Sequence, residues 1–190
     1  MQSFLVSVST VAIAEMGDRT QLLSLMLAAH YRKPWPILAG VLLATLASHT
    51  LAAIVGDRLG HFLTPGLLEG VVGLSMIGMA IWTLRPDTFE ESSSTVKRSG
   101  AFVTTLVAFF IAEIGDKTQI ATIALAAAYS TLLPVVAGTT SGMLLANAPV
   151  IFLGKAFADR LPLRALHYLA SGLFLVLGAY FIFRAAHQAG

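Results

Sequence analysis

The chain has 190 residues, of which 56% are hydrophobic and only 12% are charged, and its mean hydropathy is +0.80. Soluble proteins carry about 25% charged residues, and a soluble domain of this size has no means of burying so much apolar surface. The composition therefore indicates an integral membrane protein and excludes a soluble enzyme, a disordered tail and a nucleic-acid-binding module. The net charge is only +2, and the absence of cysteine excludes disulfides and thiolate metal sites.

Six apolar segments are each long enough to cross the hydrocarbon core of a bilayer, which takes about 20 helical residues. In chain order the predicted spans are 3–29, 35–56, 66–84, 101–128, 132–154 and 163–184. The third and fourth spans are separated by a polar stretch. We therefore predict an all-α polytopic membrane protein with six transmembrane helices. Its predicted parts are an N-terminal unit 1–85, a linker 86–100 and a C-terminal unit 101–190.

The two units are copies of each other. A shift of 98 residues places residues 13–21 (IAEMGDRTQ) on residues 111–119 (IAEIGDKTQ), and it carries Pro36 onto Pro134. Because each copy has three spans, an odd number, the second copy must enter the membrane in the opposite sense. The repeat therefore predicts two inverted three-helix repeats, an architecture found in many secondary transporters.

Lysine and arginine are distributed unequally between the two sides of this predicted arrangement. The side that contains the linker has eight of them: Arg32, Lys33, Arg85, Lys97, Arg98, Lys155, Arg160 and Arg164. The opposite side has only Arg58 and Arg184. Positive residues favour cytoplasmic loops, so we expect linker 86–100 to be cytoplasmic and both termini to lie outside.

Four of the ten acidic residues lie in the two motif copies, near the middle of the first and fourth spans: Glu15, Asp18, Glu113 and Asp116. A carboxylate at this depth costs about 2.5–3.5 kcal/mol on insertion scales, so the four should face an interior cavity and find partners there. On a regular helix Glu15 and Asp18 share one face. Gly17 and Gly115 permit either close helix packing or a local break that turns backbone carbonyls toward the cavity.

Two such acidic faces meeting between the repeats would set four carboxylates against Arg19 and Lys117, a net charge of about −2. Hard oxygen ligands with this charge suit a divalent cation such as Ca²⁺ or Mn²⁺. Protons can replace a metal on carboxylates that lie desolvated beside like charges. A structural alternative is that Glu15–Arg19 and Glu113–Lys117 form i,i+4 salt bridges that only pin helices, which leaves the two aspartates unexplained.

The duplicated Glu-x-Gly-Asp-[Arg/Lys]-Thr sequence resembles the signature of the Golgi-type Ca²⁺/Mn²⁺:H⁺ exchanger family, in the wider lysine-exporter superfamily. Both copies match in full, and the resemblance covers essentially the whole chain. It implies cation/proton exchange, with Mn²⁺ or Ca²⁺ as transported substrate and no prosthetic group. The implied metal ligands are Glu15, Asp18, Glu113 and Asp116, and the implied supporting residues are Thr20, Gln21, Thr118 and Gln119. The chain lacks the long targeting extension of eukaryotic members, so we expect a bacterial plasma membrane.

The second and fifth spans contribute one polar residue each at matching positions. The 98-residue shift pairs His49 with Asn147. His49 is a candidate proton acceptor or a partner of a motif acid, or else a histidine packed against a neighbouring helix. Asn147 is a candidate partner of an acid or a residue that holds helices together.

Three alternative functions follow from the same residues. An exporter of cationic or zwitterionic amino acids would use the acids to hold an ammonium group. An intramembrane metal-dependent hydrolase would need a ligand set with an activating base, which the sequence does not offer. A purely structural membrane protein would tolerate amides in place of the acids. We expect a transporter and no enzyme: a Mn²⁺ or Ca²⁺/H⁺ antiporter that exports the metal from the cytoplasm. Its oligomeric state is left open.

Overall fold

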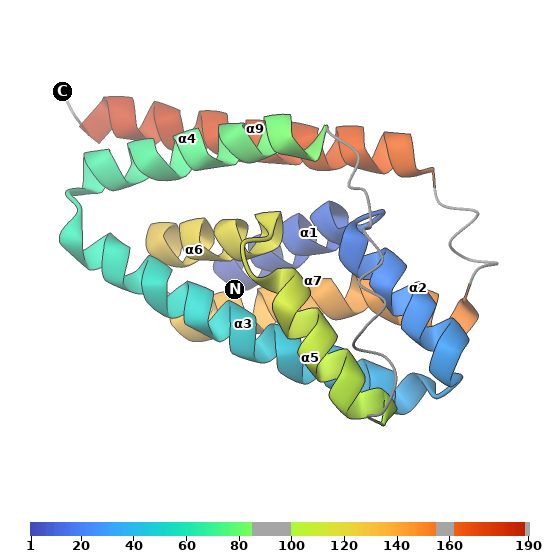
Figure 1. The fold of residues 1–190 in the computed structure, drawn as a ribbon. Helices are drawn as coiled ribbons and strands as arrows, with labels where there is room; N and C mark the ends of the chain where they lie inside the picture. The colour runs from blue at the N-terminus through green and yellow to red at the C-terminus, as the bar shows by residue number, and fades with distance from the viewer. Residues whose placement is uncertain (85–99, 155–161, 189–190) are drawn as a thin grey trace.

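The computed structural model describes residues 1–84, 100–154 and 162–188, and all regular structure in these ranges is helical (Figure 1). The helices are α1 (Gln2–Glu15), α2 (Arg19–Tyr31), α3 (Pro34–Phe62), α4 (Pro65–Thr83), α5 (Ala101–Glu113), α6 (Lys117–Tyr129), α7 (Leu132–Leu153) and α9 (Leu163–Gln188). The all-α prediction is confirmed for this part of the chain. The predicted linker 86–100 lies outside the described residues except for Gly100.

Among the described residues, four helices are long and apolar enough to cross a membrane: α3, α4, α7 and α9. Pro34 and Pro65 occupy the first positions of α3 and α4, where the missing N–H of proline has no helical partner to lose. The end of α3 at Phe62 lies beyond the predicted end at residue 56. These four helices correspond to the second, third, fifth and sixth predicted spans.

The first and fourth predicted spans are not continuous helices. The first is divided into α1 and α2, and the fourth into α5 and α6. Gly17 and Gly115 lie in the breaks with φ of +84° and +75°, where an L side chain is strained. The expectation that Glu15 and Asp18 share a face of a regular helix is therefore wrong. The chain adopts the other predicted option, a local break at each glycine.

Contacts between helices repeat with the same offset of 98 residues. α1 packs along α7, and α3 packs along α5. A Cβ added at Gly40 of α3 would lie 2.7 Å from the Cβ of Thr105, and one added at Gly138 of α7 would lie 2.7 Å from the Cβ of Ser7. The shift of 98 carries Gly40 onto Gly138 and Ser7 onto Thr105, so both halves use a glycine at the same close crossing.

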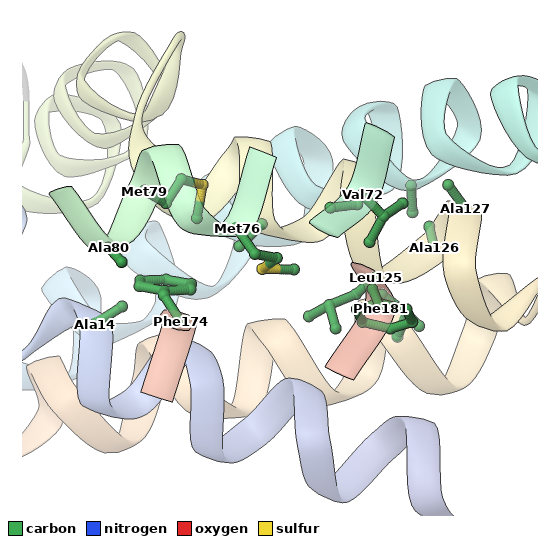
Figure 2. Close-up of a cluster of buried hydrophobic side chains, with 14 of the residues drawn as sticks. Ala14, Val72, Met76, Met79, Ala80, Leu125, Ala126, Ala127, Phe174 and Phe181 are labelled. Atoms are coloured by element: carbon green, nitrogen blue, oxygen red, sulfur yellow. The ribbon is translucent and has the colours of Figure 1, made fainter. Parts of the chain in front are cut away.

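The last helices of the two halves, α4 and α9, lie side by side and run in opposite directions (Figure 1). Their inner faces form an apolar cluster with α6 and α1, in which Phe174 and Phe181 lie near Met76 and Leu125 (Figure 2). A second cluster, which includes Val11, joins α1, α3, α5 and α7. The two clusters hold the four half-length helices α1, α2, α5 and α6 in the bundle.

Candidate functional site

The two helix breaks place the four motif acids at helix ends inside the protein. Glu15 and Glu113 are the last residues of α1 and α5, while Asp18 and Asp116 are the N-caps of α2 and α6. All four are buried. The N–H of each aspartate donates to the carbonyl of the preceding glutamate at 3.1 Å. The two copies therefore form the same turn, and each turn presents two carboxylates.

Three of the acids converge across the two halves. One carboxylate oxygen from each of Glu15, Asp18 and Asp116 lies within 4.8 Å of the other two. Glu113 is outside this trio, and its Oε1 accepts a hydrogen bond of 2.5 Å from the Thr45 hydroxyl on α3. The arrangement offers hard oxygen donors, which divalent cations such as Mn²⁺ and Ca²⁺ accept.

The two basic residues of the motif, Arg19 and Lys117, form ion pairs that join the two halves. Arg19 Nη2 donates to Asp116 Oδ1 at 3.1 Å, and the Lys117 ammonium donates to the Asp18 carboxylate. The structural alternative required pairing with a glutamate one turn earlier on the same helix. The breaks remove that i,i+4 relationship, and each cation forms an ion pair with the aspartate of the other half.

Gln21 and Gln119 connect each break to the rest of the bundle. The Oε1 of each glutamine accepts a hydrogen bond from the N–H of the glycine in its own break, at 2.9 Å and 2.8 Å respectively. The Nε2 of Gln21 donates to the carbonyl of Ala146 on α7 at 2.9 Å, and that of Gln119 donates to Ser48 Oγ on α3 at 3.0 Å. Ser48 and Ala146 are themselves 98 residues apart. Both glutamines therefore hold a glycine turn against the other half.

The two predicted threonines contact the acids. The Thr20 hydroxyl donates to the Glu15 carboxylate, and Thr118 donates to Asp116 Oδ2 through its N–H at 3.3 Å and its hydroxyl at 2.9 Å. Glu15 Oε1 and Glu113 Oε2 are buried and have no hydrogen-bond partner among the described residues. A buried carboxylate oxygen without a donor is unfavourable when charged, so these two atoms are suited to receive a cation or a proton.

The matched residues His49 and Asn147 have different surroundings. Asn147 Oδ1 accepts a hydrogen bond of 2.6 Å from Ser24 on α2, and its Nδ2 donates to the carbonyl of Met143 at 3.1 Å. His49 is completely buried, and within the described ranges neither of its ring nitrogens has a hydrogen-bond partner. The structure does not bring His49 into the acid trio, and Asn147 holds α7 to α2.

Three hydroxyl residues of the site were not predicted from the sequence. Thr45 contacts Glu113, Ser48 contacts Gln119, and Ser24 contacts Asn147. A sequence signal existed for the first two, because Thr45 and Ser48 lie four and one residues before His49, on the same buried face of α3. Ser24 follows Gln21 by three residues, which places it one turn further along α2.

Comparison with known proteins gives a match in both halves. The family model described as "Divalent cation/proton antiporter GDT1" matches residues 3–91 and again residues 101–189. A Vibrio cholerae serotype O1 protein named "Putative manganese exporter" is 51% identical over 178 residues, covering 93% of this chain and 88% of its own length. The Saccharomyces cerevisiae "Divalent cation/proton antiporter GDT1" is 23% identical over 239 residues, covering 97% and 85%. No solved structure matches the chain.

Proposed function

Because the chain belongs to the GDT1 family of divalent cation/proton antiporters, we propose that it exports Mn²⁺ from the cytoplasm in exchange for protons, with Ca²⁺ as the second candidate ion. The relative named as a manganese exporter supports the choice of metal. The observation that carries the proposal is the buried trio of carboxylates at the two helix breaks. The family assignment favours a cation over an amino acid as the transported species.

The metal would be held by Glu15, Asp18 and Asp116, with Glu113 as the fourth ligand. The first three already offer oxygens within 4.8 Å of one another. Glu113 keeps one oxygen without a hydrogen-bond partner in the described part of the chain, so it can turn to the ion while Thr45 retains the other oxygen. Four carboxylate ligands suit a hard divalent ion.

Arg19 and Lys117 hold the two aspartates in the metal-free state. The four acids and two cations sum to a charge of about −2 when all are ionised, which one divalent cation neutralises. Two protons restore the same balance. We place them on Glu15 Oε1 and Glu113 Oε2, the two buried carboxylate oxygens that have no hydrogen-bond partner among the described residues. Metal and protons would then occupy the same site in turn. His49, buried one turn beyond Thr45 on α3, is the proposed proton carrier between this site and its surroundings.

The proposed transport movement is a rocking of two inverted three-helix repeats around this site. Six crossings result if each broken pair, α1 with α2 and α5 with α6, counts as one span. The opposite directions of α4 and α9 support this arrangement (Figure 1). We propose the plasma membrane of a bacterium, with the linker cytoplasmic and both termini outside. Five of the eight cations behind that orientation lie outside the described residues: Arg85, Lys97, Arg98, Lys155 and Arg160.

Proteoliposomes with a pH-sensitive dye inside test the function. Mn²⁺ added outside should drive proton efflux with wild-type protein, and Glu15→Gln or Asp116→Asn should abolish it. Asp57→Asn is the matched control. It is the same acid-to-amide change, made at a partly exposed position beside His61. Normal exchange by both site variants would refute the site.

Parallel arms identify the transported species. Ca²⁺ and Mg²⁺ replace Mn²⁺ in separate assays, and excess lysine is added to the Mn²⁺ assay. Inhibition of Mn²⁺ exchange by lysine would favour the amino-acid exporter. Thermal unfolding followed by tryptophan fluorescence checks that each variant is folded, so that lost exchange is not lost structure.

A further inference from the structure

A cavity of about 570 Å³ lies away from the acid trio, where the end of α2 and the start of α3 meet the end of α7. Its described lining includes Arg32 and Lys33 from the α2–α3 turn and Phe152 and Leu153 from α7. None of the four motif acids is among the described lining residues. The cavity therefore combines two cations with an apolar wall at the end of predicted membrane spans.

The two cations are exposed and have no ion-pair partner within the part of the chain that the structure describes. Phe152 and Leu153 are also exposed, so the apolar wall faces outward. Trp35, which is 71% exposed, packs edge to face against Phe152 with ring centroids 5.2 Å apart. Exposed tryptophan at a helix end is typical of the membrane–water interface, where lipid headgroups lie.

The repeat supplies an internal comparison for this turn. The 98-residue shift carries Arg32 onto Ser130 and Lys33 onto Thr131. Arg32 and Ser130 both cap their helices in the left-handed conformation, with φ of +52° and +48°. The backbone of the turn therefore forms equally well without the charges. The bias of positive residues toward cytoplasmic loops accounts for cations on this side of the protein, and their position at an apolar cavity also suits them to bind a negatively charged ligand.

We propose that this cavity binds an anionic phospholipid, with the headgroup phosphate between Arg32 and Lys33 and an acyl chain along Phe152 and Leu153. A ligand that is anionic at one end and apolar at the other matches both parts of the lining. Basic pockets between membrane helices bind acidic headgroups in this way. The inference rests only on the membrane location of the protein and is independent of the transported ion.

Trp35 provides a direct probe, because the chain has only one other tryptophan, Trp82. Trp82→Phe protein is reconstituted into mixed phosphatidylglycerol and phosphatidylcholine vesicles in which either lipid carries brominated chains, at equal bromine content. Brominated phosphatidylglycerol should quench Trp35 at least about twofold more than brominated phosphatidylcholine. Equal quenching by the two lipids would overturn the proposal.

Two variants separate the site from general attraction to an anionic membrane. Arg32→Ser with Lys33→Thr gives the turn the residues of its counterpart, and it should remove the preference while thermal unfolding stays normal. Leu133, the counterpart of Trp35, is 78% exposed, so Leu133→Trp in a Trp35→Phe, Trp82→Phe background reports on the uncharged turn. That probe should show no preference. A preference that persists in the double variant, or appears equally at position 133, would contradict the site.

A soluble competitor separates a lipid from a free anion. Excess glycerol phosphate should leave the quenching preference of Trp35 unchanged, because it lacks the acyl chain that the apolar wall contacts. Loss of the preference on its addition would assign the cavity to a free phosphate ester and would overturn the lipid proposal. Mn²⁺ exchange is not part of this readout, so failure here is distinct from failure of the proposed function.

Discussion

Arg19, the first residue of α2, donates a hydrogen bond at 3.1 Å to Asp116, the N-cap of α6, across a sequence separation of 97 residues. The pair between Lys117 and Asp18 repeats this relationship with the halves exchanged. Each half therefore neutralises an aspartate of the other. A movement that separates the two breaks must disrupt both pairs or provide other partners for the four groups.

Loss of the Arg19 charge tests whether this cation competes with the metal. Arg19→Gln should raise the affinity for Mn²⁺ by at least about threefold, because it removes a positive charge that lies 3.1 Å from a proposed ligand. The same variant should exchange more slowly, since Asp116 then lacks its partner in the metal-free state. Isothermal titration with Mn²⁺ measures the affinity, and the dye assay measures exchange.

Arg58→Gln is the control for the Arg19 variant. It removes one positive charge from an exposed position on α3 and should leave the Mn²⁺ affinity unchanged. A fall in affinity in Arg19→Gln would mean that the guanidinium organises the ligands and does not compete with the metal for them.

The sequence was sufficient to find the acids but insufficient to find their geometry. The 98-residue offset revealed the repeat, and the cost of carboxylates in a membrane identified Glu15 and Asp116 as candidates. Gly17 lies within the polar motif inside a predicted span, where the local sequence allowed both a close contact and a break. The break depends on Gln21, which bonds both the glycine N–H and Ala146 on α7, and that second contact requires the docked halves.

Long-range pairings had no local signal at all. Arg19 and Asp116 are both polar residues of a repeated motif, yet helical spacing favoured partners within one copy. Their crossed pairing arises only when the N-terminal ends of α2 and α6 approach each other in the folded bundle. Thr45 was likewise predictable as a residue on the face of α3 that contains His49, but its contact with Glu113 depends on how α3 packs against α5.

The stability of variants at Gly115 should depend on how readily the new residue adopts positive φ, and not on the size of its side chain. A Cβ at this position would meet nothing within 4 Å, so the cost of Gly115→Ala is the left-handed backbone alone, about 1–2 kcal/mol. Gly115→Asn should cost less, because asparagine adopts positive φ more readily. We expect the melting temperature to fall in the order wild type, Asn, Ala, measured by tryptophan fluorescence in detergent. Equal melting of Ala and wild type would show that the left-handed turn is not maintained.

At Gly142 the size of the side chain should matter, in contrast to Gly115, because α7 packs closely on α1 there. A Cβ there would lie 2.7 Å from the carbonyl oxygen of Val8 and 2.9 Å from the backbone nitrogen of Ala12. Since both are backbone atoms of α1, Gly142→Ala should push away the helix that ends at Glu15, lowering both the melting temperature and the rate of Mn²⁺-driven proton exchange.

Gly78→Ala is the matched control for Gly142→Ala. Gly78 lies inside α4, where an added Cβ has nothing within 4 Å. Alanine should therefore be neutral or stabilising by up to about 1 kcal/mol, because it restricts the unfolded chain and favours helix. A Gly142 variant that melts and transports like the Gly78 variant would show that the close α1–α7 contact is not needed.

His49 is the residue whose role differs most from that of its counterpart. His49→Asn gives α3 the residue that α7 has at the matching position, and we expect it to slow Mn²⁺/H⁺ exchange at least about tenfold, because asparagine cannot carry a proton. Exchange of Mn²⁺ for Mn²⁺ should be retained, since it needs no net proton movement and His49 is outside the acid trio. Both modes are measured in the same vesicles, with and without Mn²⁺ inside.

His61→Asn, at an exposed position on the same helix, is the control and should alter neither mode. Equal losses in the two modes would assign His49 to metal binding or packing, and unchanged rates in both would remove it from the proton path.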